Sequence, residues 1–226
     1  MKWHEFTDRA ALDGALAEHI AAGLRRDIDA SGEASLALSG GSTPIPMLRC
    51  LSRLQLPWQQ VAVTLVDDRW VPVSHPDSNE RMLRETLLQN AAASARLVGL
   101  KTAHASPWDG LDESREKLAA VHSPFTVVVL GMGSDGHTAS WFPQAENLQQ
   151  LLSTESGERL MAVEPVTAPH QRITLTLPAV CDSLEIALHI TGEDKRAVFE
   201  SAADENYPVA AISALRAPPV SVWWAP

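Results

Sequence analysis

A short apolar run that ends in a glycine-rich turn constrains this chain more than any other stretch. Residues 126–130 read TVVVL, and GMGSDGHT follows directly. An unbroken β-branched run without polar alternation is typical of a parallel strand covered on both faces. The closely spaced glycines let the backbone turn sharply and approach another group. The stretch therefore predicts a buried strand that delivers Asp135 and His137 to its carboxyl end, where open α/β sheets bind their ligands.

This turn admits two interpretations when it is taken alone. In the first, it is an ordinary strand-to-loop connection in which Asp135 and Thr138 cap short turns, since glycine motifs by themselves often match by chance. In the second, it is a functional turn. A lone histidine is usually structural, but His137 follows both a glycine turn and a buried strand, and this position favours function.

A second turn of similar character follows the predicted strand at residues 34–38. It reads SGGSTP, from Ser39 to Pro44, and Pro44 suits the first turn of a helix that is predicted to run to about residue 54. Glycines free the backbone N–H groups, and such groups together with a helix start suit a phosphate. A plain loop with hydroxyl caps is the alternative. Because the pattern lacks the P-loop lysine and the dinucleotide fingerprint, a small phosphorylated molecule fits better than a nucleotide.

A third polar group follows the predicted strand at residues 61–66. Asp67, Asp68 and Arg69 come directly after it, and charged side chains at a strand end are costly to bury unless they are paired or functional. A surface salt bridge is the alternative, and such bridges contribute little to stability. The position at another carboxyl edge favours function. His75 lies in the next loop beside Pro76, where a histidine is more often simply exposed.

Two cations later in the chain are candidate anion ligands. Arg172 opens a predicted strand at residues 173–177, and its guanidinium is either a surface charge or a fork for phosphate oxygens. Lys195 lies in the first turn of a helix predicted to run to about residue 202. A cation there opposes the helix dipole, and this mild cost indicates an anionic partner.

Composition narrows the classes of protein and partner. The chain has 226 residues, 45% of them hydrophobic and 20% charged, which is ordinary for a globular protein with a sizeable core. The formal net charge of −10 and the absence of a basic cluster argue against nucleic-acid binding. An anionic substrate must therefore be drawn in by a local basic pocket. No apolar run reaches membrane-spanning length, and the amino terminus has no signal-peptide core, so we expect a cytoplasmic protein without a membrane partner.

The order of elements predicts the fold class. Strands alternate with helices, and most strands read as buried runs, which predicts an α/β fold with a doubly wound, mostly parallel sheet and helices on both faces. We expect a single domain over residues 1–226. The remaining helices are expected at 9–26, 80–89, 111–121 and 147–152, and the remaining strands at 97–100, 160–163, 184–191 and 220–224. Residues 208–213 are ambiguous.

Five motifs, in order along most of the chain, resemble the 6-phosphogluconolactonase family. They are LALSGGSTP (36–44), VDDRWVP with HPDSN (66–79), LGMGSDGHTASWFP (130–143), RITLTLP (172–178) and GEDK (192–195). The resemblance implies a Rossmann-like fold shared with glucosamine-6-phosphate deaminases and, more distantly, ribose-5-phosphate isomerases. The deaminases continue the Asp-Gly-His run with a segment that holds a catalytic glutamate, whereas residues 138–143 hold none. Lactonases commonly have glutamate where Asp68 stands, leucine where Trp141 stands and glycine where Gln144 stands, so the fit of the substrate is the open point.

The resemblance implies hydrolysis of 6-phospho-D-glucono-1,5-lactone to 6-phosphogluconate, with a functional link to glucose-6-phosphate dehydrogenase. A lactone is an activated ester, so neither a metal nor a cofactor is expected. Histidine has a reference pKa of about 6.5 and can take a proton from water near neutral pH. We expect His137 to act as this base, Asp67 to orient it or to bind sugar hydroxyls, and Arg69 to meet the oxyanion or the phosphate. The residues expected to bind substrate and phosphate are Gly40, Gly41, Ser42, Thr43, Gly131, Asp135, Arg172 and Lys195.

Two other functions stay open from the sequence. An isomerase or deaminase of the same fold would act on ribose 5-phosphate or glucosamine 6-phosphate. A non-catalytic sugar-phosphate sensor would bind 6-phosphogluconate without turning over a substrate, although the chain shows no appended DNA-binding segment or basic patch.

Overall fold

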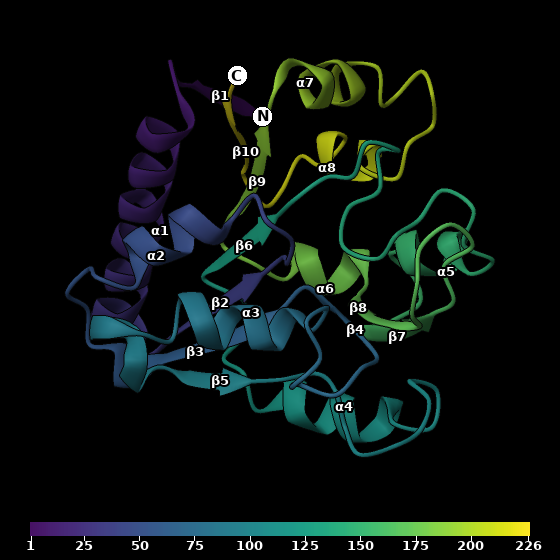
Figure 1. Ribbon diagram of the computed structural model, residues 1–226, viewed down its shortest axis with the longest axis horizontal. Helices are drawn as coiled ribbons and strands as arrows, with labels where there is room; N and C mark the ends of the chain where they lie inside the picture. The colour runs from purple at the N-terminus through teal and green to yellow at the C-terminus, as the bar shows by residue number, and fades with distance from the viewer.

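Seven parallel strands form the central sheet of the computed structural model, which describes residues 1–226 (Figure 1). Their order across the sheet is β1-β10-β9-β6-β2-β3-β5, and every neighbouring pair is parallel. The predicted α/β class with a mostly parallel sheet is therefore confirmed. The strands are β1 (Lys2–Glu5), β2 (Ala34–Leu38), β3 (Val61–Leu65), β5 (Arg96–Val98), β6 (Val127–Leu130), β9 (Ile186–Thr191) and β10 (Val220–Ala225).

A second, smaller sheet was not expected from the sequence. It contains β4 (Asp67–Arg69), β8 (Arg172–Leu175) and β7 (Leu160–Val163), which pair antiparallel in that order. From the sequence we expected one doubly wound, mostly parallel sheet. The loop between β7 and β8 is too short to hold the crossover helix that a parallel connection needs, so the two strands fold back on each other. In Figure 1 this sheet lies on the opposite side of the central sheet from α1.

The longest helix, α1 (Arg9–Ser31), runs five residues beyond its predicted end. The Asp8 side chain accepts from Ala11 N at 2.9 Å and caps its start, and Gly32 ends it in the left-handed conformation at φ 85°. Gly23 lets the helix pack closely on β6, because an added Cβ would lie 3.3 Å from Val127 Cγ2. The other α-helices are α2 (Ile45–Leu51), α3 (Asn79–Thr86), α4 (Leu111–Ala119), α5 (Leu148–Leu152), α6 (Leu177–Cys181), α7 (Glu193–Glu200) and α8 (Ala210–Ser213).

Several element boundaries differ from the prediction. Strand β1 was missed because its four residues, KWHE, show no apolar run. Strand β8 ends at Leu175, two residues early, because Thr176 caps the unpredicted helix α6 by accepting from Ala179 N. The ambiguous residues 208–213 hold the short helix α8. Two short 3-10 helices, at Trp58–Gln60 and Asn90–Ser94, complete the secondary structure.

All but two of the buried hydrophobic side chains form one cluster of 58 residues. Strands β2, β3 and β6 are buried along their whole length, as expected for parallel strands between two helical layers. Trp58 and Trp141 are the largest fully buried side chains. No helix of the chain is both long and apolar enough to span a membrane.

The strand order places a ligand-binding crevice between β2 and β6. Beyond β2 the sheet continues to β3, whereas beyond β6 it continues in the other direction to β9. The loops that leave β2 and β6 therefore diverge and open a crevice at the carboxyl edge, as at the switch points of other open α/β sheets. The two glycine turns singled out from the sequence are these two loops.

Candidate active site

The two glycine turns meet at a pocket of about 260 Å³ at the carboxyl edge of the sheet. Gly131 N, after β6, donates to Ser39 Oγ, after β2, at 3.2 Å, and Thr138 Oγ1 donates to Gly131 O at 2.8 Å. All the predicted site residues except Asp135 and Arg172 line this pocket. The lining residues that the prediction did not include are Ser39, Pro44, Asn79, Val129, Leu130, Met132, Gly133, Ala139, His189, Ile190 and Thr191.

His137 is paired with Asp135, two residues before it in the turn. The distance from His137 Nδ1 to Asp135 Oδ1 is 2.5 Å. Because an ionised carboxylate can only accept, Nδ1 carries the hydrogen, and Nε2 keeps its lone pair. Burial alone would raise the pKa of Asp135, but the charge and hydrogen bonds of His137 outweigh it and hold that pKa below its ordinary value. The pair is thus arranged as an oriented base.

Gly133, before the pair, and Gly136, between its two members, make this arrangement sterically possible. A Cβ on Gly133 would lie 2.1 Å from His137 Nδ1 and 2.4 Å from Asp135 Oδ1. Gly136 has φ 73°, and a Cβ there would lie 2.4 Å from Tyr207 Cβ. The His137 ring also contacts Phe142, with 4.6 Å between ring centroids. The backbone of the turn and the contact with Phe142 together fix the position of the imidazole ring.

Asp67 lies in the pocket wall but is not the partner of His137. Its Oδ2 accepts from Ser140 Oγ at 2.6 Å, and its main-chain oxygen accepts from Asn79 Nδ2 at 2.9 Å. From the sequence we expected Asp67 to orient His137 or to bind sugar hydroxyls, and Asp135 to bind substrate, whereas the residue in contact with His137 Nδ1 is Asp135. The second carboxylate oxygen of Asp67, Oδ1, accepts no hydrogen bond within the chain, and this oxygen is available to bind a hydroxyl.

The neighbouring Asp68 supports the chain around the site. Its carboxylate accepts from the main-chain N–H groups of Asn79 at 2.7 Å, Arg69 at 2.8 Å and Glu80 at 3.2 Å. Burial raises the pKa of Asp68 to about 7, although these donors favour its charged form. Asp68 therefore ties β4 to the start of α3, where Ser78 is the cap and accepts from Arg81 N.

The SGGSTP turn presents donors that the protein itself does not use. The main-chain N–H groups of Gly40, Gly41, Ser42 and Thr43, and the hydroxyls of Ser42 and Thr43, make no hydrogen bond within the chain. Gly40 allows Asn79 to approach, because an added Cβ would lie 1.9 Å from Asn79 Oδ1. Gly41 adopts φ 89°, which an L side chain rarely adopts. The turn therefore offers a concentrated set of free donors to an anion.

Two cations line the pocket. Lys195 Nζ donates to Met132 O at 2.6 Å, and burial lowers its pKa while the carboxylate of Asp135 partly opposes that shift. Arg69 Nη1 donates to Asp77 O at 2.7 Å, which fixes the guanidinium against the following loop. Both cations stand close to polar partners and both face the pocket, as an anionic substrate requires.

Arg172 is buried outside the pocket lining. Its side chain is only 4% exposed, and Nη1 has no hydrogen-bond partner. Burial lowers the pKa of Arg172 to about 10, and Asp67 is the nearby charge that opposes this most strongly. Its guanidinium carbon lies 5.9 Å from the centre of the Phe142 ring. The guanidinium is near enough to Asp67 for the two charges to interact, and the phosphate contact expected for Arg172 stays a prediction.

His189 is a pocket residue that sequence reasoning did not find. It lies on β9, is 2% exposed, and neither ring nitrogen makes a hydrogen bond. Burial lowers its pKa to about 4, and its Nε2 lies 3.5 Å from Asp13 Oδ1 on α1. The only available signal was a polar residue within the buried run IALHIT.

Comparison with known proteins agrees with this geometry. The family model for glucosamine-6-phosphate isomerases/6-phosphogluconolactonase matches residues 7–223. A 6-phosphogluconolactonase of Mesorhizobium japonicum is 43% identical over 226 residues, which cover 99% of this chain and 95% of that protein. One of Rhizobium meliloti is 40% identical, over 99% of this chain and 98% of that protein.

Solved structures give the same result. The crystal structure of a 6-phosphogluconolactonase from Shewanella baltica superposes with a TM-score of 0.97 at 42% identity, covering 100% of this chain and 98% of that one. A monomeric glucosamine-6-phosphate deaminase shares the fold at a TM-score of 0.78 but only 18% identity. The prediction of an enzyme of the 6-phosphogluconolactonase class is confirmed by these relatives. The chain belongs to the glucosamine-6-phosphate isomerase/6-phosphogluconolactonase family.

Proposed function

We propose that this protein hydrolyses 6-phospho-D-glucono-1,5-lactone to 6-phospho-D-gluconate, the second step of the oxidative pentose phosphate pathway. The observation that carries the proposal is the placement of an oriented base, His137 with Asp135, in one pocket with the free donors of residues 40–43. A base and an anion cradle are the two things that hydrolysis of a phosphorylated lactone needs. The names of the relatives support the same substrate.

The proposed mechanism begins with water. His137 Nε2 takes a proton from a water molecule, whose oxygen attacks the lactone carbonyl carbon. The resulting oxyanion collapses, the bond from the carbonyl carbon to the ring oxygen breaks, and the imidazolium returns its proton to that oxygen. Asp135 holds the imidazole in the tautomer with Nε2 free and stabilises the imidazolium, as the acid does in a catalytic triad.

The proposal assigns the phosphate to the SGGSTP turn and Lys195. Free N–H donors and a cation form charge-assisted hydrogen bonds, each contributing roughly 1.5–3 kcal/mol. The oxyanion is assigned to Arg69. The N–H groups of Gly131, Gly133 and Gly136 are poor candidates for it, because they already donate to Ser39 Oγ, His137 O and Gly133 O. Asp67 is then free to accept from sugar hydroxyls.

The test is the decay of the lactone, generated in situ by oxidation of glucose 6-phosphate and corrected for spontaneous opening. We expect acceleration by the wild type and none above background with folded His137→Asn. Glucosamine 6-phosphate and ribose 5-phosphate should not react, and reaction with either would favour a deaminase or isomerase. Binding of 6-phosphogluconate without lactone turnover would favour a sensor. A dehydrogenase that oxidises glucose 6-phosphate would supply this substrate, and the proposal includes that functional link to glucose-6-phosphate dehydrogenase.

A further inference from the structure

Two loops bring two imidazoles and one carboxylate together outside the pocket. His75 and Asp77 lie in the loop between β4 and α3, and His170 lies in the loop between β7 and β8. One potential ligand atom from each residue lies within 4.8 Å of the other two. These residues are partly exposed, so an ion could reach them from solvent. We propose that His75, Asp77 and His170 form a binding site for a divalent transition-metal ion of the zinc class.

The measured distances suit such an ion. Asp77 Oδ2 lies 2.9 Å from His170 Nε2 and 3.8 Å from His75 Nδ1. Zinc binds nitrogen and carboxylate oxygen at about 2.0–2.2 Å, so ligand atoms around a tetrahedral ion lie about 3.3 Å apart. The two distances bracket that value. His75 Nδ1 accepts from Asp77 N at 3.1 Å, so binding would exchange that hydrogen bond for a bond to the ion. A water molecule would take the fourth position.

The chemistry of the donor set selects the kind of metal. Two imidazoles and one carboxylate suit zinc and its transition-metal neighbours, whereas magnesium and calcium prefer oxygen ligands throughout. His170 Nε2 and Asp77 Oδ2 already face each other and hydrogen-bond at 2.9 Å. A cation that replaces the shared hydrogen would therefore find these two ligand atoms side by side.

The loop that carries His170 turns sharply at this residue. His170 adopts φ 68°, in the left-handed region that histidine enters more often than most residues do. The His75 and His170 rings stand edge to face, with 5.2 Å between their centres. The main-chain oxygen of Asp77 accepts from Arg69 Nη1, so the proposed site is joined to a pocket residue through Asp77 itself. A bound ion would tie the two loops together beside Arg69.

The test begins with protein stripped of metal by a chelator and uses zinc chloride in isothermal titration calorimetry, with cobalt(II) absorption to report imidazole ligation. We expect one zinc ion at this site in the wild type and an affinity at least 10-fold lower in His170→Asn and Asp77→Asn. Asparagine tolerates the left-handed conformation of residue 170, so the loop should keep its shape. A 100-fold excess of zinc over its Kd should raise the Tm of the wild type by about 5 °C or more.

Matched variants separate this site from other histidines. His104→Asn removes a histidine that also lies beside a carboxylate, Glu113, and should leave zinc binding unchanged. His137→Asn tests whether the pocket pair takes the ion instead. Zinc binding that survives both His170→Asn and Asp77→Asn, or that is lost only in His137→Asn, would overturn the proposal. So would a wild type that binds no zinc. None of these outcomes depends on lactone hydrolysis, so the site and the proposed function fail separately.

Discussion

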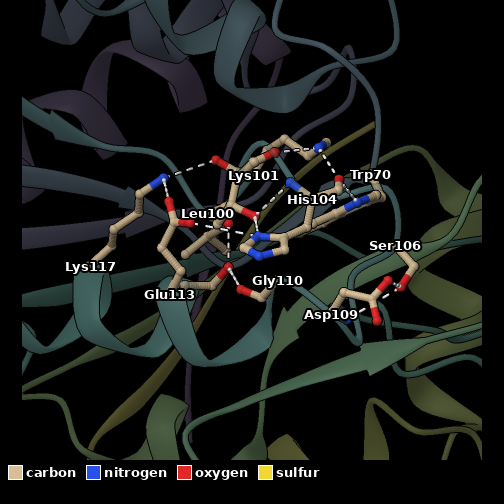
Figure 2. A network of polar contacts seen from close by, with 11 residues as sticks. Trp70, Leu100, Lys101, His104, Ser106, Asp109, Gly110, Glu113 and Lys117 are labelled. Carbon is tan, nitrogen blue, oxygen red and sulfur yellow. Dashed lines mark hydrogen bonds and ion pairs between the residues drawn. The ribbon is translucent and has the colours of Figure 1, made fainter.

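Two of the regions in which a histidine lies beside a carboxylate, the pocket pair of His137 and the network around His104, differ in what the rest of each histidine contacts. In the pocket, His137 Nδ1 contacts Asp135, and Nε2 is left without a protein partner. In the peripheral network of Figure 2, between β5 and α4, His104 Nδ1 lies 2.9 Å from Thr102 Oγ1 and 3.6 Å from Glu113 Oε2. Residue type and pairing alone therefore do not distinguish the two.

The two regions differ in how many of their hydrogen-bond donors are already paired with acceptors in the chain. In Figure 2, Lys101 Nζ and Trp70 Nε1 both donate to His104 O, each at 3.0 Å, and Lys117 Nζ donates to Lys101 O at 3.1 Å. Lys101 Nζ also lies 4.3 Å from the centre of the Trp70 ring. These contacts hold a loop against a helix. In the pocket, by contrast, the donors of residues 40–43 have no partner in the chain, so they remain available for a ligand.

The largest difference should appear when each histidine is replaced. We expect His137→Asn to lower kcat by about 10³-fold or more, because the proposed general base is removed. His104→Asn should change kcat less than 2-fold. Steady-state lactone hydrolysis, with circular dichroism to confirm folding, measures both. Near-normal turnover by His137→Asn would remove the distinction between the two regions.

Replacing the carboxylates should give the next largest effect. Asp135→Asn offers an amide where His137 needs an acceptor and favours the wrong tautomer, so kcat should fall on the order of 10²-fold with KM little changed. Glu113→Gln, in the peripheral network, is the matched control and should leave both constants unchanged. If Asp67→Asn lowered kcat while Asp135→Asn did not, the assignment of the orienting acid would move to Asp67.

Replacement of Lys195 and replacement of Lys101 should have different effects on KM. Lys195→Met removes a charge-assisted contact to the proposed phosphate and should raise KM by about 10-fold or more. Lys101→Met removes donors that serve only carbonyl oxygens of its own loop, so KM should stay the same. Initial rates over a range of lactone concentrations give the answer. An unchanged KM in Lys195→Met would contradict the phosphate assignment.

A third histidine should influence stability rather than turnover at low pH. The pKa of His189 is lowered from 6.5 to about 4 by burial, so between these values the unfolded chain binds a proton that the folded chain does not. The free energy of unfolding should therefore fall as the pH falls from 6.5 to 4. Asp13, whose pKa burial raises to about 6, takes up a proton in the folded state and offsets part of this loss. At about 1.4 kcal/mol per pKa unit, His189 by itself should contribute about 3 kcal/mol of the loss.

Urea unfolding at several pH values tests this contribution. His189→Gln should show a shallower decline in stability than the wild type between pH 6.5 and 4, whatever its stability at pH 7. His104→Asn should keep the slope of the wild type, because that ring is part of an exposed network. Equal slopes in wild type and His189→Gln would show that His189 does not contribute.

The sequence predicted the inner strands of the central sheet well because these strands are mostly apolar. It also predicted the two glycine turns at the carboxyl edge, since glycines and polar side chains directly after buried strands are typical of the ligand-binding loops of open α/β sheets. It could not predict β4, because the three residues of DDR carry no periodicity and their strand exists only through pairing with β8. The parallel pairing of KWHE is likewise set by tertiary contact with β10.

The division of labour within the site also needed the structure. Asp135 and His137 are two residues apart. Their side chains can meet because Gly136 adopts a positive φ and because Gly133 has no side chain to block the contact. The two adjacent acids make different contacts. Asp67 lines the pocket, whereas Asp68 accepts hydrogen bonds from main-chain N–H groups at the start of α3. Arg172 opened the expected strand, but its burial could not be read from a sequence position.

The parallel pairing of β1 with β10 has a practical consequence for fusion proteins. Lys2 lies opposite Ser221 and Glu5 opposite Trp224, so the chain enters at the amino edge of the sheet and leaves at its carboxyl edge. A purification tag at the carboxyl terminus would therefore emerge on the side that holds the pocket. A tag at the amino terminus emerges on the opposite side and is the better choice for kinetic and metal-binding measurements.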